Sequence, residues 1–266
     1  MSSATLVSEA PIEAVAQSIP VLDRLAQDFD TAASVRLSVV IPVYNEARTI
    51  ATVLGRVWRS GLAHEIIVVD DGSTDGTADL LRRFQGHAGL RLLYHARNRG
   101  KGSALRTAFG QVTGDIVLIQ DADLEYDPAD YERLLRPIIE GCADVVFGTR
   151  FGSGRGSMSW PRYWGNRLLT WLSNRFTGLR LSDMETGYKL LRREALEQIA
   201  PTLRESAFGI EPELTAKAAA LPGVRIAEQP ISYRPRRRAD GKKIRWRDGL
   251  VAAWCIVKYR RRRNRV

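Results

Sequence analysis

The chain has 266 residues, of which 44% are hydrophobic and 26% are charged, the composition of an ordinary soluble globular protein. This length allows one large α/β domain, with or without appendages. No stretch approaches the roughly 20 apolar residues that a membrane-spanning helix needs. Residues 1–20 lack the basic and apolar regions of a signal peptide. We therefore expect neither a transmembrane segment nor a signal peptide.

The net charge of +10 is concentrated towards the C-terminus. Residues 225–266 hold 15 of the 40 Lys and Arg residues but 3 of the 30 Asp and Glu residues. This asymmetry indicates an anionic partner, either a membrane surface or a nucleic acid. Cys142 and Cys255 lie far apart beside apolar residues, so we expect small buried side chains, a reducing compartment and no disulfide framework.

Strands and helices are predicted to alternate through the first 150 residues. Apolar, mostly β-branched runs predict strands at residues 37–42, 65–72, 90–94, 116–119 and 143–148. Helical patterns predict helices at residues 45–57, 78–84, 100–111 and 128–140, the first with Asn45 as its N-cap. This alternation is typical of the α/β class, with a mostly parallel central sheet and helices on both faces.

The pattern changes after residue 150. Gly, Ser, Trp and Arg dominate residues 150–182, which we expect to form irregular structure facing a substrate, with a helical stretch at 163–176. The remaining elements are predicted as helices at 192–200 and 211–220, a strand at 224–233, a basic loop at 234–247 and a short apolar-basic helix at 250–260. The predicted organisation is a flexible or helical extension at 1–33, with at most one helix at 12–29, a catalytic domain at 34–248 and a helix or tail at 249–266.

Two carboxylates follow the most apolar strand. Residues 116–119 are all apolar, and Asp121 and Asp123 come just after them, separated by Ala122. Such a strand is buried on both faces, and open α/β sheets bind ligands at the carboxyl ends of their strands. Carboxylates this close repel each other unless something positive lies between them. A divalent cation shared with substrate phosphates would supply that charge; a turn with two solvated aspartates is the alternative.

Two further strand ends are expected at the same edge of the sheet. The first carries Tyr44 and Glu46, and the second carries Asp71 before Gly72. An aromatic ring can stack on a nucleotide base, and a carboxylate can accept hydrogen bonds from the base or the ribose. Taken singly, Tyr44 is better explained as a core aromatic and Asp71 as a turn former. Three acidic strand ends in one sheet favour a nucleotide site.

The motifs at these strand ends resemble the family 2 glycosyltransferases. The match is closest to the dolichol-phosphate mannosyltransferase-like branch, the polyprenyl-phosphate sugar transferases, and it spans about residues 36–250. It is carried by VIPVYNE (40–46), VVDDGSTDGT (68–77), KG (101–102), QDADLE (120–125), GTRF (148–151), DMETGYK (183–189), FGIEPE (208–213) and GKKI (241–244). The resemblance implies a single Rossmann-like nucleotide-diphospho-sugar transferase domain. It also implies a nucleotide-sugar donor of the GDP-mannose or UDP-glucose type, Mg2+ or Mn2+, and inversion at the anomeric carbon.

The resemblance implies roles for individual residues. Nucleotide-sugar binding is implied for Pro42, Tyr44, Glu46, Val69, Asp71, Asp121, Ala122, Asp123, Glu125 and Arg150. Metal binding is implied for Asp121, Asp123 and Glu125, the last at a position where relatives often have glutamine. Catalytic contacts to the diphosphate and the acceptor phosphate are implied for Asp121, Asp123, Arg150, Arg236, Lys242 and Lys243. In one departure, relatives often carry transmembrane helices after the catalytic domain, and none is predicted here.

The acceptor decides whether the reaction needs a base. A phosphate acceptor is already anionic near neutral pH and needs positioning and desolvation. A hydroxyl acceptor needs a general base, for which Glu185 and Asp183 are the candidates; either could instead be a buried carboxylate that shapes its loop. The basic residues from Arg236 to Lys243 suit a loop that closes over the donor phosphates, or else a solvated basic loop.

The C-terminal segment has the composition of an interfacial helix. Leu250, Ala253, Trp254 and Val257 fall on one helical face, and an arginine cluster follows at residues 260–263 and 265. Such a segment suits an anionic membrane surface; a core helix with a basic end explains it equally well. Together with a polyprenyl-phosphate acceptor, it predicts a cytoplasmic enzyme, peripheral at the inner face of the membrane.

Three other functions compete with this interpretation. The first is a glycosyltransferase that acts on a soluble or protein hydroxyl acceptor. The second is a nucleotidyltransferase, which would need a glycine-rich first loop, and residues 42–48 contain no glycine. The third is a basic nucleic-acid-binding protein, which the acidic strand ends disfavour because without metal they would repel phosphate. We therefore expect no nucleic-acid partner.

Overall fold

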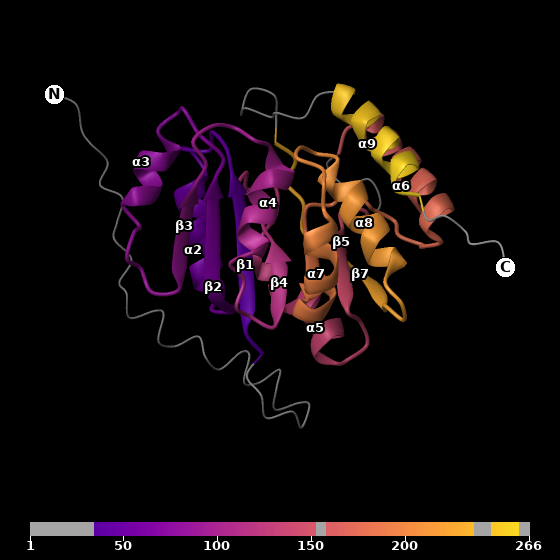
Figure 1. Cartoon of the computed structure of the whole chain (residues 1–266), viewed down its shortest axis with the longest axis horizontal. Coiled ribbons are helices and arrows are strands. Elements are labelled where there is room, and N and C mark those ends of the chain that lie inside the picture. The colour runs from indigo at the N-terminus through magenta and orange to yellow at the C-terminus, as the bar shows by residue number, and fades with distance from the viewer. Residues whose placement is uncertain (1–34, 153–157, 237–245, 261–266) are drawn as a thin grey trace.

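The structure is a computed structural model that describes residues 35–152, 158–236 and 246–260. A seven-stranded sheet crosses the molecule, with helices in front of it and behind it (Figure 1). Its strands are β1 (Leu37–Val43), β2 (Ala63–Asp70), β3 (Leu90–Tyr94), β4 (Ile116–Ile119), β5 (Val145–Thr149), β6 (Lys189–Arg192) and β7 (Ile226–Pro230). The helices are α2 (Ile50–Ser60), α3 (Thr77–Arg82), α4 (Lys101–Phe109), α5 (Tyr131–Ile139), α6 (Trp160–Thr177), α7 (Arg193–Ile199), α8 (Ile210–Ala220) and α9 (Trp246–Lys258), with short 3-10 turns at Pro128–Asp130 and Ala200–Thr202.

The sheet is parallel except at one inserted strand. The strand order is β3-β2-β1-β4-β6-β5-β7, and β6 runs antiparallel to both β4 and β5. The pairs β1–β2, β1–β4, β2–β3 and β5–β7 are parallel, so their carboxyl ends meet at one edge. The predicted mostly parallel α/β sheet with helices on both faces is confirmed.

Two hydrophobic cores lie on the two faces of the sheet. Successive side chains of a strand point to opposite faces, so Val39 and Ile41 join one core while Val40 joins the other. The first core contains apolar side chains of α2 and α5, and the second those of α4, α7 and α8. Because both faces are covered, the strands read as continuous apolar runs rather than as alternating ones.

Strand β6 was not predicted. Its four residues begin with Lys189 and end with Arg192, so they lack the long apolar run that identified the other strands. Lys189 is fully buried in the centre of the sheet, where its charge is neutralised by Glu211. The antiparallel strand separates β4 from β5 and places the residues just before it beside the carboxyl end of β4.

Several local predictions were wrong in detail. Helix α2 begins at Ile50, and Asn45 does not cap it; its side chain accepts a hydrogen bond from the backbone N–H of Thr74 at 2.7 Å. The helical stretch predicted at 163–176 is confirmed, but α6 is a few residues longer and covers residues 160–177. Cys255 is buried, whereas Cys142 is exposed.

The predicted domain boundary at residue 249 falls inside α9. This helix packs against α6 and α8 and buries Ala252, Cys255 and Ile256, so it is continuous with the catalytic domain. The predicted helix at 12–29 lies outside the described residues. Among the residues described, no helix is both long enough and apolar enough to cross a bilayer.

Candidate active site

A cavity of about 1210 Å³ opens at the carboxyl edge of the sheet. Its walls come from the loops that follow β1, β2, β4 and β5, from α6, and from the N-terminal turns of α8 and α9. Among the described residues, only Asn45 and Leu124 combine a side chain with a positive φ, and they lie in the loops after β1 and β4. Strained backbone of this kind gathers where a functional site dictates the chain path.

Asp121 is held at the cavity wall by an ion pair with a buried lysine. Its carboxylate pairs with the Nζ atom of Lys101 at 2.6 Å, and the same ammonium lies 2.8 Å from Glu211. Burial alone would lower the pKa of Lys101, but the two carboxylates outweigh it and raise that pKa, so the lysine stays charged. Glu211 also pairs with Lys189. These four residues form a buried charge network beside the cavity.

The position of Asp121 depends on close packing around it. A Cβ atom at residue 187 would collide with the Asp121 carboxylate and the Tyr126 ring, so glycine is required there. Behind the aspartate, Gln120 accepts hydrogen bonds from the hydroxyls of Tyr131 and Tyr188, each at 2.7 Å. Gln120 also donates to the carbonyl of Asp121 at 2.9 Å. The end of β4 is therefore fixed from both sides.

Asp123 lies in an electrostatic field that disfavours its ionised form. Burial, followed by the nearby carboxylates of Asp121, Glu125 and Glu46, raises the pKa of Asp123 to about 7. A carboxylate among carboxylates is stabilised by a cation. Among the described residues, no lysine or arginine forms an ion pair with Asp123. Asp123 is therefore the acidic residue of this cavity with the strongest need for an added positive charge.

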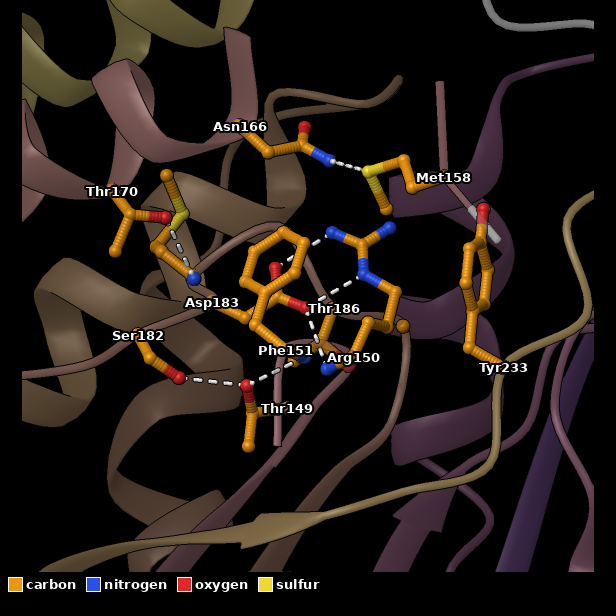
Figure 2. A network of polar contacts seen from close by, with 12 residues as sticks. Thr149, Arg150, Phe151, Met158, Asn166, Thr170, Ser182, Asp183, Thr186 and Tyr233 are labelled. Carbon is orange, nitrogen blue, oxygen red and sulfur yellow. Dashed lines mark hydrogen bonds and ion pairs between the residues drawn. The ribbon is translucent and has the colours of Figure 1, made fainter. Parts of the chain in front are cut away.

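Arg150 and Asp183 form a buried ion pair beside the cavity. The Nε and Nη2 atoms of Arg150 each donate to the Asp183 carboxylate at 2.6 Å (Figure 2). The guanidinium also lies over the rings of Phe151 and Tyr233, at 5.8 and 5.4 Å from the centroids. Arg150 lines the cavity, as predicted for a phosphate-binding residue. Asp183 is fully buried behind it, so of the two candidate bases it is the one committed to structure.

Glu185 is the other candidate base, and it lines the cavity. Its Oε1 atom is buried and has no hydrogen-bond partner among the described residues. Burial, together with the negative charge of Glu211, outweighs the attraction of Lys189 and Arg150 and raises the pKa of Glu185 to about 7. A carboxyl group with this pKa can hold or release a proton near neutral pH.

The first residues of the basic loop are tied to the cavity by two carboxylates. The Nη1 atom of Arg236 donates to both oxygens of Glu46, at 2.7 and 2.8 Å. Glu125 accepts hydrogen bonds from the backbone N–H of Arg236 at 2.8 Å and from the Tyr233 hydroxyl at 3.3 Å. Glu125 therefore anchors this segment in the structure, and the metal ligation predicted for it stays a prediction.

Asp71 shapes the loop between β3 and α4. Its carboxylate accepts hydrogen bonds from the backbone N–H groups of Arg99 at 3.0 Å and Gly100 at 2.6 Å, and it lies 2.7 Å from Nδ1 of His95. These contacts position the start of α4 and hence Lys101. Asp71 also lines the cavity, where base binding stays a prediction.

The structure brings most of the predicted site residues to one cavity. Its lining includes Pro42, Tyr44, Glu46, Asp71, Asp121, Ala122, Asp123, Glu125, Arg150 and Arg236. Val69 does not join them, because it is fully buried in the core beneath α4. Lys242 and Lys243 lie outside the described residues.

Sequence reasoning gave no role to Lys101 and Glu211. The sequence did offer one indication: each is a charged residue in a glycine-containing motif, and each lies in the first turn of its helix, α4 or α8. They are important because Lys101 pairs with both Asp121 and Glu211, and only the tertiary structure brings these residues together.

The acidic residues are suited to a hard divalent cation, although they do not enclose one. Within residues 35–152, 158–236 and 246–260, no three His, Cys, Asp or Glu side chains form a group that could hold a metal ion by themselves. Mg2+ is commonly held by one or two carboxylates together with substrate phosphates. Asp123, with its raised pKa and acidic neighbours, fits such an incomplete site.

Comparison with known proteins identifies the class of enzyme. Residues 38–200 match the glycosyl transferase family 2. The undecaprenyl-phosphate mannosyltransferase of Micrococcus luteus is 29% identical over 240 residues, which cover 82% of this chain and 96% of that protein. The polyprenol monophosphomannose synthase of Mycolicibacterium smegmatis is 31% identical over 235 residues, covering 83% of this chain and 87% of that one.

Solved structures share the fold. The glucosyl-3-phosphoglycerate synthase from Mycobacterium tuberculosis, in complex with Mn2+, UDP and phosphoglyceric acid, has a TM-score of 0.67 and 24% identity, covering 88% of this chain and 80% of that one. A complex of the same enzyme with Mg2+ and UDP has a TM-score of 0.62 and 23% identity, covering 88% and 83% of the two chains.

The fold is that of the nucleotide-sugar transferases, and the family match makes the protein a glycosyltransferase. The chain belongs to the glycosyl transferase family 2, and the predicted family is confirmed.

Glu185 should make stability depend on pH. Its folded-state pKa of about 7 exceeds the ordinary value of 4.5, so ionisation at higher pH destabilises the folded protein. We expect Glu185→Gln to raise the melting temperature relative to the unsubstituted protein by a few degrees more at pH 8 than at pH 5, since each 1 kcal/mol is worth about 2–4 °C in a domain of this size. Thermal denaturation between pH 5 and pH 8 measures this.

The matched control is Glu197→Gln, which removes an exposed carboxylate paired with Arg193 on α7. Its melting temperature, relative to the unsubstituted protein, should not rise between pH 5 and pH 8. A melting-temperature difference for Glu185→Gln that is the same at pH 5 and pH 8 would contradict the assignment of a buried, unpartnered carboxyl.

Proposed function

We propose that this enzyme transfers a hexose from a nucleoside-diphosphate sugar, of the GDP-mannose or UDP-glucose type, to a polyprenyl phosphate. The observation that carries the proposal is the cavity whose lining combines Asp121 and Asp123 with the basic residues Lys101, Arg150 and Arg236. The names of the two curated relatives, both polyprenyl-phosphate sugar transferases, support the choice of acceptor. We further propose that the enzyme works peripherally at the cytoplasmic face of the membrane.

The donor would lie across the carboxyl edge of the sheet. Tyr44 and Asp71 line the cavity at the ends of β1 and β2 and suit the base and ribose. The diphosphate would then lie towards Asp123, between the Lys101 and Arg236 walls. Asp121 and Asp123 would hold Mg2+ or Mn2+ together with the donor phosphates. When bound, the cation supplies positive charge that stabilises the departing nucleoside diphosphate.

The residues of the chain position the reactants and exclude water. Arg150, locked by Asp183 and flanked by aromatic rings, presents a fixed positive charge to a phosphate group. An acceptor phosphate is already a nucleophile near neutral pH, so positioning it in line with the anomeric carbon is the main requirement. A single displacement of this kind inverts the anomeric configuration. Protonated Glu185 would then leave an anionic acceptor without like-charge repulsion.

A hydroxyl acceptor is the second candidate, and Glu185 is the observation that favours it. Its raised pKa, its unpartnered Oε1 atom and its position on the cavity wall are those of a general base. Such a base would deprotonate the hydroxyl as it attacks the anomeric carbon.

Asp123→Asn should nearly abolish transfer, by at least about 100-fold, because charge stabilisation at the leaving group is commonly worth this much. The fold should persist, since Asp123 ion-pairs with none of the described side chains and contributes no apolar core contact. Sugar transfer from a panel of GDP and UDP sugars, with Mg2+, with Mn2+ and with chelator, measures both metal and donor dependence.

The control is Asp79→Asn, which removes an exposed carboxylate of α3 that does not line the cavity. It should transfer at the normal rate. Unchanged turnover by Asp123→Asn at limiting metal would exclude this aspartate from the reaction, and full activity in chelator would exclude the cation.

Glu185→Gln separates the two acceptor classes. With a polyprenyl phosphate we expect transfer to fall less than about tenfold, whereas loss of a general base costs about 10²- to 10⁴-fold. The assay compares undecaprenyl phosphate with undecaprenol, so that the two acceptors differ in the phosphate alone. If the unsubstituted enzyme transfers sugar to undecaprenol and Glu185→Gln abolishes that transfer, the acceptor is a hydroxyl and not the proposed phosphate.

A further inference from the structure

The described surface gathers its large exposed hydrophobic side chains on two neighbouring helices. Seven of the eight are on α6 and α9: Trp160, Trp164, Leu168, Trp171, Leu250, Val251 and Trp254. The eighth, Tyr94, is on β3 at the other edge of the sheet. Helices α6 and α9 pack against each other at the end of the molecule away from β3 (Figure 1). We call these seven residues the aromatic face.

The spacing on α6 forms a continuous stripe. Trp160, Trp164, Leu168 and Trp171 are three or four residues apart, so they project from one side of the helix. Their exposed fractions lie between 59% and 64%, and Trp254 on α9 is 66% exposed. The opposite side of α6 buries the small side chains of Thr170, Ser173 and Thr177. The stripe therefore projects away from the protein rather than into its core.

The chemistry of this face matches the boundary between lipid headgroups and acyl chains. Tryptophan is enriched at that boundary because its ring is apolar and its N–H is polar. Helix α6 contains three arginines and no acidic residue. One of them, the exposed Arg175, continues the stripe four residues after Trp171. Basic residues beside an aromatic helical face are typical of helices that lie on an anionic lipid surface.

The same two helices also form part of the cavity wall. Arg162, Gly165, Asn166 and Leu169 of α6 line the cavity, as do Asp248 and Gly249 of α9. On α6 the lining residues and the exposed stripe lie on different sides of one helix, which is about 10–12 Å across with its side chains. A phosphate at the headgroup level would therefore lie within one helix width of the catalytic cavity.

We propose that the aromatic face of α6 and α9 docks the enzyme on an anionic bilayer, with the cavity opening towards the headgroups. The tryptophans enter the interface, and the arginines attract the lipid phosphates. A lipid-linked acceptor then presents its phosphate to the cavity while its chain stays in the membrane. This deepens the proposed function and rests on it for the acceptor. The docking itself is measured without donor or acceptor.

The test is co-sedimentation of the full chain with vesicles of phosphatidylglycerol and phosphatidylcholine. The variant Trp164→Ser/Trp171→Ser should bind about tenfold or more weakly, since each substitution removes a large apolar side chain from the interface. Tyr94→Ser is the matched control, because it removes the exposed aromatic side chain at the opposite edge, and its binding should be unchanged. Binding should weaken with salt and on pure phosphatidylcholine.

A second measurement does not depend on any variant. Four of the six tryptophans of the chain belong to the aromatic face. Vesicles with brominated acyl chains should therefore quench the tryptophan fluorescence of the unsubstituted enzyme. Equal sedimentation of the double variant and the unsubstituted enzyme, or no quenching and no sedimentation, would overturn the proposal. So would a dimer in analytical ultracentrifugation that the double variant dissociates, since the face would then bind a second copy.

These outcomes are distinct from failure of the proposed function. An enzyme that binds vesicles through the aromatic face but transfers no sugar to polyprenyl phosphate would keep the docking surface and lose the acceptor. If the enzyme transfers sugar to a polyprenyl phosphate but does not bind vesicles, the proposed acceptor stands and the proposed docking surface is wrong.

Discussion

The mutual repulsion of carboxylates at the carboxyl edge of the sheet is the constraint on which this structure depends. Glu46, Asp121, Asp123 and Glu125 lie in the loops after β1 and β4, and Glu185 and Glu211 reach the same cavity. Removing this much negative charge from water is expensive unless each carboxylate gains a cation, a hydrogen bond or a proton. The chain supplies all three to different members of the group, and each solution fixes a different part of the site.

Lysine side chains neutralise Asp121 and Glu211. Lys101 bridges Asp121 and Glu211, and Lys189 reaches Glu211 from inside the sheet. These two lysines lower the pKa of Glu211 despite its burial. A buried network of this kind resists change because the loss of one partner leaves an uncompensated charge. It therefore ties together the end of β4, the first turn of α4, strand β6 and the first turn of α8.

The remaining carboxyl groups of the cavity form no ion pair with a lysine that the structure describes. Glu125 and Glu46 hold the start of the basic loop through Arg236 and Tyr233. Asp123 and Glu185 keep raised pKa values instead. Perturbed ionisation of this kind gathers in active sites, where it is relieved by substrate, cation or proton. The pKa values of Asp123 and Glu185 therefore lie at about 7, where a carboxyl group can take up or release a proton near neutral pH.

The sequence by itself determined the sheet, the family and most of the cavity. Continuous apolar runs identified β1 to β5 because strands covered on both faces need no polar positions, and the acids at their ends marked the binding edge. Only the tertiary structure decided the structural roles of Glu125, Asp183, Lys101 and Glu211, because each depends on a partner between 20 and 111 positions away along the chain. Strand β6 escaped prediction because a lysine inside a sheet is stable only when another element supplies its counter-charge. The aromatic face was found in part: Trp254 was predicted on an interfacial helical face, whereas the tryptophans of α6 had no predicted role until the packing of α6 on α9 showed them exposed.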